Sequence, residues 1–468
     1  MKINKFIYVL IAGAVVSTSC KKSFLDQKPP AAVNIGDAIK TESDMGDAVN
    51  GMFNASRSSS LFGRDIPVLG DVLADNAYVS SSNSGRYLQE NNYTFIATNA
   101  EALNIWSQGY YTILQANRII NTALPTSTAV GLYKGEAYTT RALVYLQLAN
   151  FYSAPYTVNQ GADGVPLVTG YQGAYTKPSR SKLADVYAKI ISDLDSAYAI
   201  MPATAASSEY MNKYAAKALQ ARAYLYKGDY AGARDAALEV VNKGGYSLLT
   251  AAGFTAYWTN PGPVTNKQET IFELALTNIT NNGTAGLDYI YNPAGYGDIL
   301  STDPLYNLYS ATDVRKTLII NGKRSGVQAY IVNKYSNVSN PNDRDDLKIL
   351  RYSEVLLTLA ESYARLGDAV NALKYLNQLV AQRDPSLVYA SAGDQLVNDI
   401  LTERRKEFAF EGLRFFDLKR TNVTINRPVQ ANSAPSIATI APDNFRRLLP
   451  IPQTETDVNK NITQNTGY

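Results

Sequence analysis

The chain has 468 residues, of which 46% are hydrophobic and 18% are charged, so it can bury a sizeable core and is not of disordered composition. It has no histidine and one cysteine, which excludes Ser-His-Asp and Cys-His catalysis, an intrachain disulfide and a cysteine-rich metal site. The formal net charge of +3 is too balanced for a dedicated nucleic-acid-binding protein, so nucleic acid is not expected as a partner. Neither a phosphate-binding loop nor metal-ligand spacing is present in the sequence, so we expect no cofactor and no metal.

The N-terminal segment predicts export and lipidation. Lys2 and Lys5 precede an apolar run over residues 6–16, which is too short to span a bilayer, and small residues lead to Cys20. Because this is the anatomy of a secretory signal and Cys20 is the sole cysteine of the chain, residues 1–19 are predicted to be a lipoprotein signal peptide. We expect Cys20 to carry the lipid that holds the mature protein at a membrane.

The body of the chain predicts pairs of helices with long loop insertions. A linker with two prolines covers residues 21–36, and residues 59–100 resemble a long mixed loop region. Residues 244–346 hold short strand-like runs, and residues 421–468 are mostly irregular. Helices are predicted over residues 37–58, 101–124, 132–152, 181–201, 209–227, 230–243, 347–366, 368–382 and 394–411. The fold class is therefore mostly α with a few short strands, in two intergrown regions, 20–243 and 244–468, that form one body.

Two helical segments repeat each other 139 residues apart. The residues that recur are Ala221, Tyr224, Gly228, Asp229 and Ala233, which match Ala360, Tyr363, Gly367, Asp368 and Ala372. This spacing is typical of the tetratricopeptide helix-turn-helix, in which small residues let two helices approach and glycine ends the first helix in a left-handed conformation. Since the repeats are not in tandem, dispersed helical hairpins are expected to form the scaffold.

The segment 402–420 carries the densest charge pattern. Glu403, Glu407 and Glu411 lie one turn apart, as paired catalytic carboxylates would. The arginines Arg404, Arg405 and Arg414 are expected to neutralise these acids, and neutralised acids keep low pKa values and are poor general acids. We therefore predict a structural ion network that buries Arg404 with Glu407 and has no catalytic residues; Phe408, Phe410, Leu413 and Phe416 are predicted to pack it.

Several motifs together give the chain a family resemblance. They are Cys20 with Phe24-Leu25-Asp26, Trp106 with Tyr110-Tyr111 and Ala116 to Ile120, Gly135-Glu136-Ala137 with Arg141-Ala142 and Tyr145, Glu403 to Glu407 with Gly412 and Phe416 to Arg420, and the ending Leu449 to Pro452 with Gln464 to Tyr468. With these motifs the chain resembles the SusD/RagB family of nutrient-binding outer-membrane lipoproteins. Thr466 stands where the family usually has proline before the final Gly-Tyr.

This resemblance implies a scaffold of tetratricopeptide-like units with loops above it. It also implies a lipid-anchored protein exposed at the surface of the outer membrane, with a SusC-type TonB-dependent transporter as partner. The function implied is non-catalytic capture of an oligosaccharide and its delivery to that transporter. Three alternatives stay open: a peptide ligand, as in the RagB branch, a lipid-anchored glycosidase that uses Glu or Asp, and a pure protein-interaction scaffold.

The ligand-binding residues are predicted from chemistry, because the family has no fixed ligand signature. A sugar needs flat rings for its C–H face and fixed Asn, Asp or Arg side chains for its hydroxyls, and two loop regions offer both. The candidates are Asp75, Asn76, Tyr78, Arg86 and Tyr87 in the first region, and Asn282, Asp288, Tyr289, Tyr291 and Tyr296 in the second. The alternative for each tyrosine is that it only packs its loop. Trp106 is predicted to be a core residue, and Trp258 is left open as a further platform.

Overall fold

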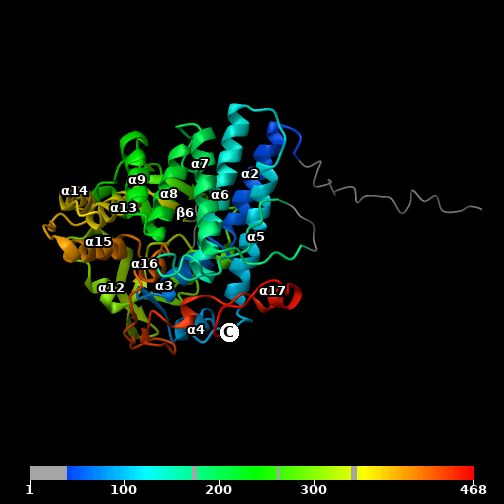
Figure 1. Ribbon diagram of the computed structural model, residues 1–468. Helices are drawn as coiled ribbons and strands as arrows, with labels where there is room; N and C mark the ends of the chain where they lie inside the picture. The colour runs from blue at the N-terminus through cyan, green and yellow to red at the C-terminus, as the bar shows by residue number, and fades with distance from the viewer. Residues whose placement is uncertain (1–38, 171–175, 261–263, 339–344) are drawn as a thin grey trace, which may run out of the picture.

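The structure is a computed structural model that describes residues 39–170, 176–260, 264–338 and 345–468 (Figure 1). The signal segment and Cys20 lie outside the described residues, so the lipidation prediction stays a prediction. Within the described ranges, no helix combines the length and the apolar character needed to cross a membrane.

Nine long helices contain most of the helical residues among those described. They are α2 (Glu42–Arg57), α5 (Ala100–Ile120), α6 (Thr128–Tyr152), α7 (Leu183–Ile200), α8 (Lys213–Lys227), α9 (Tyr230–Lys243), α13 (Tyr352–Arg365), α14 (Ala369–Val380) and α15 (Gly393–Glu407). Polar side chains begin several of them: Thr41 forms a capping box with Asp44, and the Asn212 side chain accepts hydrogen bonds from the first turn of α8. The mostly helical fold predicted from the sequence is confirmed.

The long helices pack side by side in the order of the sequence, with one insertion between α9 and α13. Consecutive helices pack together from α5 to α9, and α9 then packs against α13, from which the stack continues through α14 to α15 (Figure 1). Residues 244–351 are therefore an insertion between two neighbours of the stack. Helix α2 packs against α5 and α6 at the other end.

The two repeated segments are equivalent hairpins, α8–α9 and α13–α14. Gly228 and Gly367 end their first helices with φ of +78° and +84°, a region in which glycine has no steric penalty. Asp229 and Asp368 then cap the second helices through their carboxylates. Since α9 packs on α13, the dispersed repeats lie side by side in the stack, as the pattern predicts.

The inserted segment and the loops build small sheets and short helices, which contact helices along the stack from α2 to α13. The strands are β1 (Ala77–Val79), β2 (Thr270–Leu274), β3 (Ile299–Ser301), β4 (Ile319–Arg324), β5 (Val327–Val332), β6 (Leu347–Arg351), β7 (Ile425–Asn426) and β8 (Thr439–Ile440). One antiparallel sheet has the order β1-β3-β5-β4, and β2–β6 and β7–β8 form two-stranded pairs. The shorter helices are α3 (Asp65–Val72), α4 (Leu88–Asn92), α10 (Ala251–Thr259), α11 (Leu287–Tyr291), α12 (Asp303–Asn307), α16 (Arg414–Arg420) and α17 (Gln453–Val458), with 3-10 turns η3 (Gly283–Ala285), η4 (Val314–Leu318) and η5 (Phe445–Arg447).

Two sequence predictions about the secondary structure are wrong. Residues 347–351 form strand β6 and not the start of a helix, because this short apolar run pairs with β2. Periodicity alone cannot separate a short buried strand from a helix end. The region 59–100 is also no surface loop: it contains α3, all of whose residues are buried, and β1, a strand of the sheet.

Candidate functional site

Three of the predicted site residues meet at the surface: Arg86 follows β1, Tyr289 lies on α11, and Tyr296 lies in the loop before β3. The guanidinium carbon of Arg86 lies 4.0 Å from the centroid of the Tyr296 ring. The Tyr289 ring meets Tyr296 edge to face, with centroids 5.7 Å apart and planes at 64°. All three side chains are half-buried, so each offers part of its surface to solvent. We call Arg86, Tyr289 and Tyr296 the aromatic–arginine cluster.

Backbone contacts hold the cluster in place. Asp298, which is fully buried, accepts a hydrogen bond from the Ser84 backbone N–H at 3.0 Å, and its carbonyl accepts one from Ser80 at 2.8 Å. Arg324 donates to the Tyr296 carbonyl at 2.5 Å and to the Ser82 carbonyl at 3.0 Å. The two loops are thereby tied to each other and to the sheet, so the aromatic faces are positioned before any ligand arrives.

Other predicted site residues lie in the interior, where they hold the loops together. Asp75 forms two hydrogen bonds with Arg414, at 2.7 and 2.9 Å. Asn76 donates to Asp71 at 3.1 Å and accepts from Arg405 at 2.8 Å. Because both side chains are more than 90% buried, they support the region and present no surface to a ligand.

The remaining tyrosines of the prediction are also interior. Tyr87 is 2% exposed, and its hydroxyl donates to Asp65 at 2.5 Å, while burial raises its pKa. The Tyr78 hydroxyl donates to Asn432, and the Tyr291 ring stacks on Tyr335 at 5.7 Å. Asp288 is 4% exposed. For these residues the structure favours the alternative that they pack their loops.

Asn282 lies in a different place from the cluster. It lines a groove of about 360 Å³ between α2, α5 and residues 279–282, where its amide donates to the Arg57 carbonyl at 2.8 Å.

Neither tryptophan offers an exposed ring on which a sugar could stack. Trp106 is 4% exposed among Tyr110 and Tyr152, so the prediction of a core residue is confirmed. Trp258 is 3% exposed, with Lys334 at 4.1 Å from its ring.

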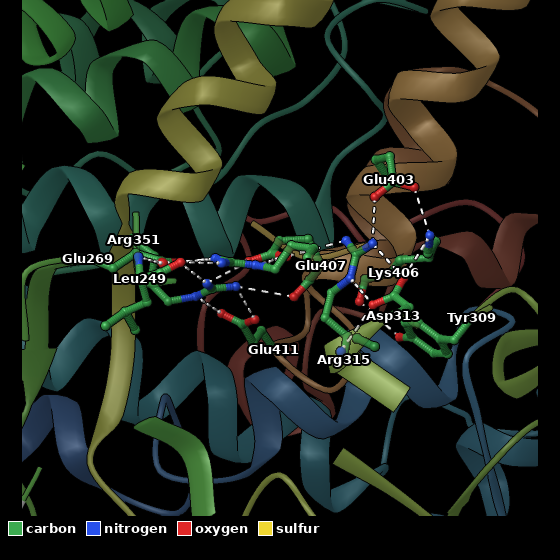
Figure 2. Close-up of polar contacts among 12 residues, drawn as sticks. Leu249, Glu269, Tyr309, Asp313, Arg315, Arg351, Glu403, Lys406, Glu407 and Glu411 are labelled. Atoms are coloured by element: carbon green, nitrogen blue, oxygen red, sulfur yellow. Dashed lines mark hydrogen bonds and ion pairs between the residues drawn. The ribbon is translucent and has the colours of Figure 1, made fainter. Parts of the chain in front are cut away.

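The three glutamates of the 402–420 segment are held in ion pairs, with Glu403 and Glu407 buried and Glu411 half-buried (Figure 2). Glu407 contacts Arg351 at 2.8 Å, Arg383 at 3.1 Å and Arg315 at 3.4 Å. Burial alone would raise the pKa of Glu407, but these guanidinium groups together lower it. Glu411 has a lowered pKa for the same reason, with Arg351 and Lys334 outweighing its burial. A carboxylate held in its charged form by arginines is a poor general acid.

The partners predicted from the sequence for these acids are wrong. Arg404 is buried but pairs with Asp417 at 3.0 Å, in a second cluster that also holds Arg420 and Glu361. Arg405 and Arg414 pair with Asp75 instead. The arginines that neutralise Glu407 come from η4, from the end of β6 and from the residues after α14, and spacing along one helix cannot reveal them.

A further aromatic pair lies partly at the surface and was not predicted. Tyr306 and Tyr330 stack with centroids 4.0 Å apart and planes at 17°, and Lys316 lies 4.7 Å from the Tyr306 ring. Both rings are half-buried. No motif marks them in the sequence, because the two tyrosines belong to separate elements, α12 and β5. In the described part of the chain, no group of three or more acidic or cysteine side chains is arranged to hold a metal ion.

Comparison with known proteins matches nearly the whole chain. The profile of the SusD family matches residues 320–468, and a profile described as "Starch-binding associating with outer membrane" matches residues 23–225. The SusD-like protein P2 of Formosa agariphila is 25% identical, with both chains fully covered.

Solved structures agree with this assignment. A SusD superfamily protein of Bacteroides vulgatus is 29% identical with a TM-score of 0.85, over 92% of this chain and all of the other. One of Bacteroides thetaiotaomicron is 28% identical with a TM-score of 0.82, over 91% of this chain and all of the other. A further Bacteroides vulgatus structure, whose description proposes sugar binding, is 29% identical with a TM-score of 0.84, over 92% of this chain and 99% of the other. With its stacked tetratricopeptide-like hairpins and its motifs in place, the chain belongs to the SusD/RagB family.

Proposed function

We propose that the protein captures glycan chains at the cell surface, and that the aromatic–arginine cluster is its binding surface. The observation that carries the proposal is the tyrosine pair Tyr289–Tyr296 with Arg86 against one ring, half-exposed and fixed by buried contacts. Tyrosine rings fit the apolar C–H face of a sugar, and the guanidinium and hydroxyl groups beside them can bond its hydroxyls. The starch-binding family description and the sugar-binding relative support this choice of ligand class.

The proposal includes no catalytic step. Glu403, Glu407 and Glu411 are the acidic residues whose helical spacing resembles paired catalytic carboxylates, and all three are held in ion pairs with arginines. Retaining glycosidases place two carboxyl groups about 5 Å apart across a sugar, with one of them protonated. The lowered pKa values of Glu407 and Glu411 oppose that role.

The wider setting of the proposal comes from the family. We propose that Cys20 carries the lipid anchor at the outer membrane and that a SusC-type TonB-dependent transporter receives the captured ligand. Cys20→Ala should then release the protein from the membrane fraction of cells that lack the transporter. Retention of this variant on such membranes would contradict the anchor.

A binding screen tests the ligand class. The purified mature chain should be retarded in native gels that contain a soluble polysaccharide, starch first, and should release no reducing sugar from it. Retardation by none of a panel of polysaccharides, together with binding of peptides, would replace the glycan with the peptide alternative. Release of reducing sugar would contradict the non-catalytic role.

A further inference from the structure

The groove between α2 and α5 is separate from the aromatic–arginine cluster and shares no lining residue with it. It measures about 360 Å³, and residues 279–282 form its third wall. Its side chains are mostly amides and hydroxyls, and Arg57 is the one charged residue among those that line it; the residues used below are Asn54, Arg57, Gln108, Tyr111 and Asn282. The groove is therefore polar and carries positive charge only.

Arg57 is a partly desolvated cation that forms no ion pair with a described residue. Its Nη1 donates to the Ala275 carbonyl at 3.2 Å, and its Nε is buried with no hydrogen-bond partner in that part of the chain. Among the described residues no carboxylate lies within 4 Å of it, and burial lowers its pKa against the attraction of the more distant Glu209 and Asp346. An anion in the groove would offset this cost, because opposite charges attract more strongly at a partly buried site than in water.

The amides of the groove are held with their oxygens available. Gln108 donates its amide to the Ala55 carbonyl at 2.8 Å, and Asn282 donates to the Arg57 carbonyl at 2.8 Å. Their side-chain oxygens accept no hydrogen bond from the described residues, so both can accept from ligand hydroxyls. Tyr111 stands beside them with 51% of its surface exposed, which is the flat face that a sugar ring needs.

We infer that this groove is a second glycan-binding site, which takes an anionic sugar unit with a carboxylate or a sulfate ester. The hydroxyl acceptors and the exposed tyrosine select a sugar, and the uncompensated Arg57 selects a negative charge on it. The inference rests on the proposed function, since it gives the same protein a second contact with a glycan chain. Two sites on one chain would raise the avidity for a long polymer.

Calorimetric titration of the mature chain tests the inference with three probes. They are tetragalacturonate, which has carboxylates, a sulfated carrageenan tetrasaccharide, and neutral maltotetraose. Asn54 is exposed on α2 and makes no side-chain hydrogen bond among the described residues, so a matched pair of variants can change the charge there with little effect on the fold. Asn54→Asp should lower the affinity for an anionic probe and Asn54→Lys should raise it, each by roughly threefold to tenfold. The affinity for maltotetraose should not change.

Two further variants test the groove itself. Arg57→Gln and Tyr111→Ala should each lower the affinity for the better anionic probe at least fivefold, whereas Tyr210→Ala, at an exposed tyrosine outside both sites, should leave that affinity unchanged. Circular dichroism and thermal melting identify any variant that fails to fold, and the Asn54 pair then decides. Equal binding of all three probes at the groove, or no response of an anionic probe to the Asn54 pair, would overturn the inference. If the groove fails this test but Tyr296→Ala still weakens the binding of maltotetraose, the proposed function holds without a second site. If no glycan binds at all, the proposed function and the second site are both wrong.

Discussion

Glu407 shows how a single residue can hold distant segments of this fold together. Its carboxylate contacts Arg315, Arg351 and Arg383, all of them less than 2% exposed. Glu269 shares Arg351 and Arg383 with it, at 2.8 and 2.7 Å (Figure 2). The negative charge is thus balanced by arginines from three segments, and removing it would leave the buried cluster with an excess of positive charge.

Glu407→Ala should therefore lower the free energy of unfolding by about 3–5 kcal/mol, measured by urea denaturation. Asp235→Ala is the matched control, because Asp235 pairs with Arg234 at an exposed position and should contribute less than about 1 kcal/mol. If both variants lose the same small amount of unfolding free energy, the buried network does not stabilise the fold as stated.

Glu136 is a buried carboxyl group that forms no ion pair with a described residue. Its Oε1 accepts the Met211 backbone N–H at 3.0 Å, its Oε2 has no hydrogen-bond partner in the described ranges, and burial raises the pKa of Glu136 from 4.5 to about 8. The folded protein thus keeps this proton up to about pH 8, whereas the unfolded chain loses it above about pH 4.5. The contribution of Glu136 to stability is therefore present below pH 4.5 and is lost as the pH rises through 8.

Glu136→Gln should remove this pH dependence. The stability of the wild type relative to the variant should fall between pH 4.5 and pH 8, by up to about 4 kcal/mol. Urea denaturation of both proteins at pH 5 and pH 8 measures the difference. If the wild type instead became more stable relative to the variant as the pH rises, Glu136 would be charged in the folded state.

At the scale of elements, the long helices could be predicted because their signals are local. Ala221 and Ala360, with Gly228 and Gly367, mark the hairpins, and the structure confirms both of them. Helix α3 could not be predicted in this way, since all of its residues are buried and no polar face gives it a 3.6-residue period.

The candidate site could be predicted only in part, for a similar reason. Tyr87 and Tyr296 occur in loops of the same composition, but Tyr87 bonds Asp65 in the interior while Tyr296 lies half-exposed beneath Arg86. That difference depends on contacts between segments far apart in the sequence. The same holds for Arg324, which fixes the Tyr296 carbonyl and carries no motif of its own.

Helix α3 meets the turn after α15 through two glycines. A Cβ atom at Gly70 would lie 2.0 Å from the Gly412 carbonyl oxygen, so the two backbones are in direct contact. Gly70→Ala should cost about 3 kcal/mol or more, because backbone atoms must move. Gly367→Ala is the control: a Cβ atom there has open space, and only the positive φ costs about 1 kcal/mol. Equal losses of unfolding free energy in the two variants would contradict the close contact.

At the scale of the whole molecule, a continuous helical stack supports the sheets and short helices that the loops and the inserted residues form. The stack is continuous from α5 to α15, and the aromatic–arginine cluster is held by the sheet that the inserted residues form. Such a site is preorganised but shallow. Its affinity for a glycan should therefore be modest, in the micromolar to millimolar range.

The most direct test of the account is calorimetric titration of the wild type, Tyr289→Ala and Tyr296→Ala with the polysaccharide that retards the protein in native gels. Loss of one ring should weaken binding by about fivefold or more, since an aromatic contact contributes on the order of 1 kcal/mol. Tyr210→Ala, at an exposed tyrosine outside the cluster, should bind like the wild type. Unchanged affinity in both cluster variants, with intact folding, would contradict the claim that this surface binds the glycan.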